Sequence, residues 1–224
     1  MAWYERKYTR IGGEAILNFK LLSMRNVLVA NIILTIAGLG MFLSTFALTY
    51  RFQYEFHYSI LKTGLSLVPF ALGTIIFGPI AGKFVSRTGV KPLSILGAIT
   101  ASTGFILQAT LPGYNGVLVY EFIIGAGLSL LNGTLINFIV LTVNPRDMGI
   151  ATAMNSTFRS LGSSIGAPIA GSMMTMYAIN RIPTGDAFSY TFIIAAVIFV
   201  VAAALIPFGR EVLGKMEQHT SKKA

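Results

Sequence analysis

The sequence has no cysteine, only two histidines and few acidic side chains. Without cysteine, the chain forms no disulfide and binds no zinc or iron–sulfur centre through thiolates. The two histidines, His57 and His219, lie in a connecting segment and in the C-terminal tail, far apart in the sequence. They offer no catalytic or metal-binding cluster, so we expect no metal, no cofactor and no enzyme active site.

Charge is scarce throughout, and apolar residues take its place. Charged residues make up 11% of the 224 positions against about 25% in a soluble domain, and the mean hydropathy is +0.71. Apolar runs of twenty or more residues recur, whereas the buried strands of soluble enzymes are short. The composition predicts an all-α integral membrane protein. In such a protein the net charge of +9 concerns topology and does not indicate nucleic acid as a partner.

Six segments are long enough to cross about 30 Å of hydrocarbon at 1.5 Å per residue. We expect them at residues 26–50, 60–84, 92–111, 115–142, 148–178 and 187–208. They form a transmembrane bundle over 26–210. Residues 1–25 read as a cytoplasmic lead-in that lies partly in the membrane interface, and residues 211–224 as a basic cytoplasmic tail.

Lysine and arginine are distributed unevenly between the connecting segments. With the N-terminus inside the cell, the cytoplasmic segments hold 13 of these residues and the outer ones hold only Arg51, Lys62 and Arg181. Positive charge stays on the cytoplasmic side during insertion. The sequence therefore predicts a multi-pass protein of the cell membrane with both termini in the cytoplasm.

The segment 148–178 carries a permanent charge, Arg159, near its middle. A charge there costs roughly 2.5–3.5 kcal/mol on insertion scales. Asn155, Arg159 and Ser163 follow one another at spacings of four, so they share one helical face. We expect this face to meet water or a polar partner instead of lipid.

The same segment also has small residues at regular spacing. Gly162 and Gly166 begin a ridge suited to close helix contact, and Pro168 removes a backbone donor and should bend the helix.

Two other spans carry polar residues at helical spacing. Asn31 lies in 26–50, and Glu121 and Asn132 lie in 115–142. We expect these faces to look into a polar interior and the segments 92–111 and 187–208 to face lipid. Plain helix packing remains an alternative for such positions, and Glu121 also fits an interfacial carboxylate that reaches the headgroups.

The segment GKFVSRTGVK, after the second span, resembles the G-x-x-x-D-R-x-G-R-R/K loop that joins the second and third helices of each half in the major facilitator superfamily. Four residues match: Gly82, Arg87, Gly89 and Lys91. Ser86 replaces the acid, which puts a charge-relay role in doubt. A loop of this kind makes a tight glycine turn and presents cations to a helix end and to anionic headgroups.

A second match lies in the fifth span. Its residues resemble the glycine–proline signature of drug–proton exchangers, with the proline displaced by one position: Gly162, Gly166, Pro168 and Gly171. The stretches YERKYTRIGGEAILNFKLLSMRNV, LVPFALGTIIFGPIAGKFVSRTG and NSTFRSLGSSIGAPI resemble the last six helices of the fourteen-helix drug–proton antiporters, the QacA-like multidrug permeases.

This resemblance implies a six-helix C-terminal half-bundle of a major-facilitator fold. It implies proton-coupled efflux of hydrophobic or cationic organic compounds by alternating access between two halves. The partners would be membrane lipids, an N-terminal half or a second copy, a small organic substrate and protons; alone, the chain should be inactive. The candidates for the lining of the transport cavity are Asn31, Glu121, Asn132, Asn155 and Arg159.

Two other functions remain open at this point. The chain could be a non-transporting membrane subunit, or a truncated product, that acts through helix–helix association. A membrane enzyme would need an acid, base or metal cluster inside the bilayer, and the sequence offers only Glu121 and Arg159 there.

Overall fold

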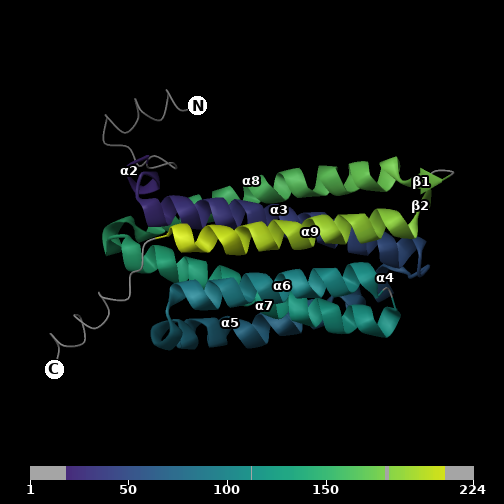
Figure 1. The fold of residues 1–224 in the computed structure, drawn as a ribbon, viewed down its shortest axis with the longest axis horizontal. Coiled ribbons are helices and arrows are strands. Elements are labelled where there is room, and N and C mark those ends of the chain that lie inside the picture. Colours follow the sequence, from purple (N-terminus) through teal and green to yellow (C-terminus); the bar gives the residue numbers. More distant parts are fainter. Residues whose placement is uncertain (1–18, 112, 180–181, 210–224) are drawn as a thin grey trace.

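A computed structural model of the chain describes residues 19–111, 113–179 and 182–209. These residues are almost entirely helical, apart from one short antiparallel strand pair (Figure 1). The elements are α2 (Phe19–Leu22), α3 (Arg25–Tyr54), α4 (Ile60–Ser66), α5 (Val68–Thr88), α6 (Val90–Thr110), α7 (Tyr114–Thr142), the 3-10 turn η1 (Pro145–Asp147), α8 (Met148–Met176), β1 (Ala178–Ile179), β2 (Ile182–Pro183), α9 (Gly185–Leu205) and the 3-10 turn η2 (Ile206–Phe208).

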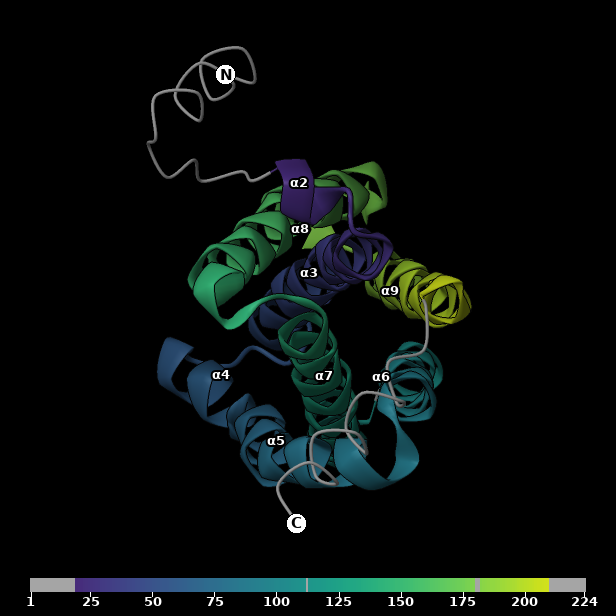
Figure 2. The same cartoon turned by 90° about the vertical axis from the view of Figure 1, so that its left-hand side faces the viewer.

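The long helices form two layers, which are seen from one end in Figure 2. In one layer α3 packs between α8 and α9, and in the other α7 packs between α5 and α6. The layers meet where α3 contacts α7 and where α6 contacts α9, so the α6–α9 edge is closed. At the opposite edge α8 and α5 stand apart.

Five segments of the described residues are long and apolar enough to cross a membrane: Arg25–Tyr54, Ile60–Val85, Val90–Thr110, Gly116–Thr142 and Gly185–Phe208. The all-α membrane fold is therefore confirmed for five of the six expected spans. The remaining helix, α8, is 29 residues long, but ten of these residues are Ser, Thr, Asn or Arg. That polar content lowers its hydropathy, although α8 lies along α3 for most of its length (Figure 1).

Three helix limits differ from those expected. The first span continues to Tyr54, so Arg51 belongs to a helix and not to an outer loop. The second is divided at Leu67 into α4 and α5, because Pro69 has no N–H to continue the ladder. The fifth ends at Met176, and the chain turns there into the β1–β2 hairpin.

Glycines allow α3 and α8 to approach closely. A Cβ at Gly162 would collide with the backbone carbonyl of Thr35, and a Cβ at Gly166 with the carbonyl of Leu39 and, at 3.0 Å, the nitrogen of Leu43. These three neighbours are backbone atoms, which cannot rotate away as a side chain could. The expected small-residue ridge thus lies directly against α3.

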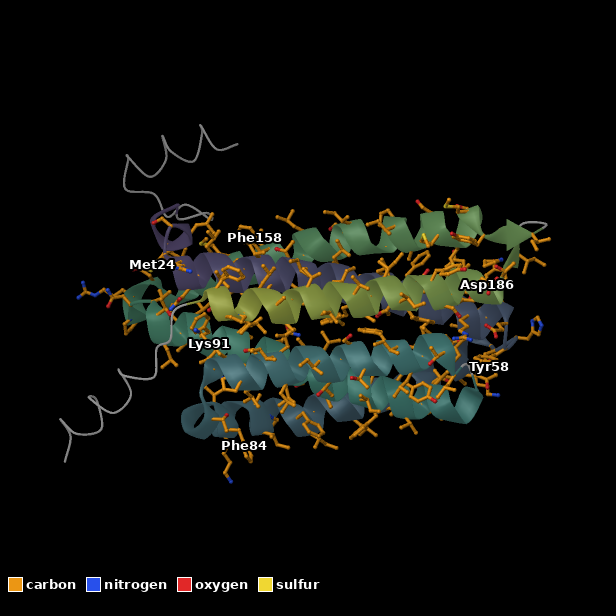
Figure 3. All side chains as sticks on the ribbon, viewed as in Figure 1. Met24, Tyr58, Phe84, Lys91, Phe158 and Asp186 are labelled. Carbon is orange, nitrogen blue, oxygen red and sulfur yellow. The ribbon has the colours of Figure 1, made fainter. Side chains whose placement is uncertain are left out.

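Side chains mark the two ends of the bundle in Figure 3. Met24, Phe84 and Lys91 lie at one end, and Tyr58 and Asp186 lie at the other. The loop between α5 and α6 therefore lies at the end where α3 begins. We call this the Lys91 end and the opposite one the Tyr58 end.

Candidate functional site: a groove between α3 and α8

A cavity of about 550 Å³ opens between the middle parts of α3 and α8. Two large apolar residues of α3 and a polar stretch of α8 line it: Met41, Phe42, Arg159, Ser160, Ser163, Ser164 and Ala167. Three hydroxyl groups and one guanidinium therefore face two apolar side chains. This is the composition of a site for a molecule with both polar and apolar parts.

A second cavity, of about 570 Å³, lies further along the same two helices toward the Tyr58 end. Its α3 wall is an aromatic ladder of Phe46, Tyr50 and Tyr54. The first two rings stack with centroids 4.7 Å apart, and the next two with centroids 5.4 Å apart. The other wall is made by Gly171, Met174, Thr175, Ala178 and Pro183.

Helical spacing shows that the two cavities share one seam. Phe42 of the first cavity precedes Phe46 of the second by four residues, so both lie on one face of α3. On α8, Ser164, Ala167 and Gly171 continue at spacings of three and four, again on one face. We call these two neighbouring cavities together the α3–α8 groove.

Among the described residues that line the groove, Arg159 is the only one with a charged side chain. Its backbone carbonyl lies against Gly38, which is close to the midpoint of α3, so Arg159 lies near mid-depth in the bundle. The side chain is exposed, and within the described part of the chain its guanidinium has no hydrogen-bond or ion-pair partner. Of the face that the sequence predicts to meet water or a polar partner, Arg159 and Ser163 line the cavity, whereas Asn155 is buried.

A cluster of charged residues, separate from the groove, lies toward the Tyr58 end around Arg51, which is only 1% exposed. Its Nε donates to Glu55 Oε2 at 2.8 Å, and its Nη1 donates to the backbone carbonyl of Gln108 at 3.1 Å. The guanidinium also lies about 6 Å from the centres of the rings of Phe56, Phe188 and Phe192. Arg51 thereby connects α3 with the C-terminal end of α6 and with α9.

Glu121 of α7 belongs to this cluster and not to the groove. It is buried, and its Oε1 accepts a hydrogen bond from Gln108 Nε2 at 3.3 Å. Gln108 thus joins Arg51, through its backbone, to Glu121, through its side chain. Among the described residues no hydrogen bond or ion pair joins Glu121 to Arg159, although these were the two charges that the sequence placed inside the bilayer.

The three asparagines named with them are dispersed. Asn31 is fully buried in α3, where its Nδ2 donates to the carbonyl of Val27 at 2.8 Å and its Oδ1 has no partner in the structure. Asn132 of α7 is half-buried, and its Oδ1 is also without a partner. Asn155 of α8 is buried. The five candidate residues therefore do not converge on one site.

Nothing in the described ranges resembles a metal centre. No group of three or more His, Asp or Glu side chains gathers within them.

Comparison with known proteins places the fold in a family. The family model described as Major Facilitator Superfamily matches residues 30–222, most of the chain. The chain belongs to the Major Facilitator Superfamily. The resemblance noted in the sequence is therefore confirmed at the level of the superfamily.

Several relatives within the superfamily are named for drug transport or resistance. The chain is 28% identical over 170 residues to the multidrug transporter protein MdtP of Bacillus subtilis. This match covers 75% of the present chain and 31% of MdtP. It is 25% identical over 185 residues to a multidrug resistance protein B homolog of Mycobacterium tuberculosis, covering 80% and 33%. With the tetracycline resistance determinant of Streptomyces rimosus the identity is 24%, and the match covers 77% and 51%. The chain spans about a third of the length of the first two relatives.

The segment that resembles the superfamily loop is mostly helical: it forms the last residues of α5, which was expected to end at residue 84, and the first residues of α6, with only Gly89 between the two helices. Gly89 adopts φ 86°, a conformation that side chains disfavour, and its N–H donates to the carbonyl of Val85 at 3.0 Å. Gly82 is exposed and Lys91 is half-buried, while the side chain of Arg87 lies outside the described part. Of the glycine–proline signature, Pro168 is exposed within α8 and Gly171 lines the groove.

Sequence reasoning missed two features. Arg51 was counted as an outer-loop cation, and Phe46 and Tyr50 received no role. The spacing of four between Arg51 and Glu55, like that from Phe46 to Tyr50 to Tyr54, was a signal for both. The first span was expected to end at Tyr50; the aromatic pattern crosses this limit, and the Arg51–Glu55 pair lies just beyond it.

Proposed function

We propose that the chain is one six-helix half of a secondary transporter that moves small organic compounds across the cell membrane by alternating access. This half is the C-terminal one of a QacA-like fourteen-helix drug–proton antiporter. It is a transporter and not an enzyme. The observation that carries the proposal is the α3–α8 groove, which holds an unpaired guanidinium at mid-depth within a superfamily that includes multidrug transporters.

In this proposal α8 is the sixth span. Its 29 residues are long enough, and it runs alongside α3, which is apolar enough to span by itself. The polar residues that lower its hydropathy include the serines and the arginine of the groove. A helix that lines a water-filled groove does not need to be apolar on that face, because the cost of a charge falls where water can reach it.

The two-layer arrangement indicates which helices would face lipid and which would face the other half of the transporter. The closed α6–α9 edge would face lipid, and the open edge between α8 and α5 would meet an N-terminal half or a second copy. Six helices provide one wall of the cavity that alternating access requires. We therefore propose that the chain alone does not transport, and that both termini and the α5–α6 loop face the cytoplasm.

Proton coupling is assigned to Glu121 within this half. A carboxyl group inside a bundle is a candidate carrier because it is costly to keep ionised there. Glu121 is buried at the Tyr58 end and contacts Gln108, whose carbonyl in turn accepts from Arg51. Protonation at Glu121 would therefore change a contact that joins α3, α6 and α7.

The test compares lipid vesicles that contain the purified chain alone with vesicles that contain it joined to an N-terminal half. A pH gradient should drive movement of a hydrophobic fluorescent dye only in the second preparation. Proton-driven transport by the chain alone, from a species that crosslinking shows to be monomeric, would refute the half-transporter assignment. Absence of transport of every dye in both preparations would favour a subunit that acts by helix association.

A further inference from the structure

We infer that the α3–α8 groove selects aromatic amphiphiles that carry a negative charge, with the acid group on Arg159 and the ring system on the aromatic ladder of Phe46, Tyr50 and Tyr54. The physiological use of this selectivity rests on the proposed transport function. The binding itself does not, and it can be measured separately.

The charge of the lining decides the sign of the ligand. Arg159 lines the groove and no Asp or Glu does, within either set of lining residues. Glu121 and Glu55 are engaged by Gln108 and Arg51 at a different place. An organic cation in the groove would meet a like charge that no lining carboxylate compensates, whereas an anion would neutralise it.

Arg159 is also the only charged donor to an acid group among the described residues that line the groove; the hydroxyls of Ser160, Tyr50 and Tyr54 are neutral, weaker donors. The hydroxyl of Ser163 donates to the carbonyl of Arg159 at 2.9 Å, and that of Ser164 donates to the carbonyl of Ser160 at 2.9 Å. Because these hydroxyl protons are already used, the two serines present mainly lone pairs to the groove. The planar guanidinium has five N–H donors and matches the two oxygens of a carboxylate.

The spacing along α3 sets the shape of the ligand. Arg159 lies at the level of Gly38, and the ladder begins eight residues later at Phe46. Eight residues of α-helix correspond to about 12 Å along the groove. An acid group separated from a flat ring system by a few single bonds would reach both.

The ladder by itself does not choose between charges. Stacked aromatic rings bind flat apolar bodies and also attract cations through their faces. Such a surface alone would accept the hydrophobic or cationic compounds that the family resemblance implies. The guanidinium at the other end of the groove is the feature that favours the anion.

The test uses three ligands with one carbon skeleton: naphthalenebutyric acid, naphthalenebutanol and naphthalenebutylamine. Saturable binding to the full chain in lipid nanodiscs is measured by equilibrium dialysis near neutral pH, with empty nanodiscs subtracted. We expect the acid to bind about tenfold tighter than the alcohol, and the amine to bind weakest. Equal or tighter binding of the amine would overturn the inference.

Variants separate the charge from the ladder. Arg159→Gln should reduce the affinity for the acid to that for the alcohol, while Arg159→Lys should keep part of the preference and so report on folding. Tyr50→Leu should lower the affinity for the acid and the affinity for the alcohol by the same factor. Arg146→Gln, at an exposed cation of η1, is the matched control and should change nothing. Unchanged affinity for the acid in Arg159→Gln would refute the role of the guanidinium.

The two proposals fail in different ways. If the assembled protein transports the amine and Arg159→Gln has no effect on any of the three affinities, the ligand inference is wrong and the transporter assignment stands. If the acid binds as expected but a pH gradient does not move it across vesicles that contain the assembled protein, the transporter assignment is wrong and the groove remains an anion-binding site.

Discussion

Replacing Arg51 by methionine tests whether the cluster at the Tyr58 end holds the bundle together. Methionine keeps an apolar side chain among the three neighbouring phenylalanine rings but removes both hydrogen bonds. The carbonyl of Gln108 is one of the last carbonyls of α6, which lack helical partners, and Arg51 supplies a donor to it. The substitution would leave this carbonyl buried and unpaired, because Gln108 is 0% exposed.

The expected loss can be built from the two contacts. A hydrogen bond to a charged group contributes about 1.5–3 kcal/mol, and this range applies to the Gln108 carbonyl. The contact with Glu55 counts for less, about 0.5–1 kcal/mol, because that side chain is 35% exposed and water can replace Arg51. The sum is about 2–4 kcal/mol, which for a chain of this size corresponds to a fall in Tm of roughly 5–15 °C.

The assay is thermal unfolding of the purified chain in detergent, followed by circular dichroism. Arg51→Lys should lie between the wild type and Arg51→Met, since lysine keeps the charge but not the fork. Arg146→Met is the control at an exposed cation and should change stability by less than about 0.5 kcal/mol. An apolar replacement of a buried ion pair can also stabilise a protein. A Tm of Arg51→Met equal to or above that of the wild type would therefore show that our reasoning about the Gln108 carbonyl is wrong.

Three further outcomes are expected. Gly162→Ala should destabilise the α3–α8 contact by about 1–3 kcal/mol because its Cβ meets backbone atoms, whereas Gly149→Ala, with no atom within 4 Å, should be neutral in the same unfolding assay. Glu121→Gln should retain the fold, since an amide still fits beside Gln108, but should abolish pH-gradient-driven transport; gradient-driven transport at the wild-type rate would exclude this carboxyl as the proton carrier. Cysteines placed at Ser59 and Ser86 should be labelled by an impermeant reagent from outside only at Ser59, and the reverse pattern would invert the topology.

The length and the hydropathy of the apolar segments predicted most of the fold. Six apolar segments were visible because a span needs about twenty apolar residues, and five of them are helices that meet this condition in the structure. The resemblance to the superfamily rested on local motifs. One of them includes Gly89, whose φ of 86° between two helices explains why the motif has a glycine there. Such properties depend on residues that are near one another in the chain.

The helix limits were less accurate because charge was taken as the end of a span. A charged side chain at the edge of the apolar segment reads as interfacial when its partners are unknown. Arg51 is instead enclosed by Gln108 and three phenylalanines from later parts of the chain. The same applied to α8, whose polar content is explained by a groove that forms only against α3.

The sequence by itself therefore determined that this is a helical membrane protein, because span length is a local property, and its resemblance to known motifs together with the family model gave the Major Facilitator Superfamily. Only the tertiary structure decided which charges are paired. From the sequence, Glu121 and Arg159 were both candidates for the lining of a transport cavity, since both lie within apolar segments. Packing of α7 against α6 joins Glu121 to Gln108, and packing of α8 against α3 leaves Arg159 free at a groove. Whether a charge inside a bundle is a structural contact or a binding group depends on the neighbours that helix packing brings to it.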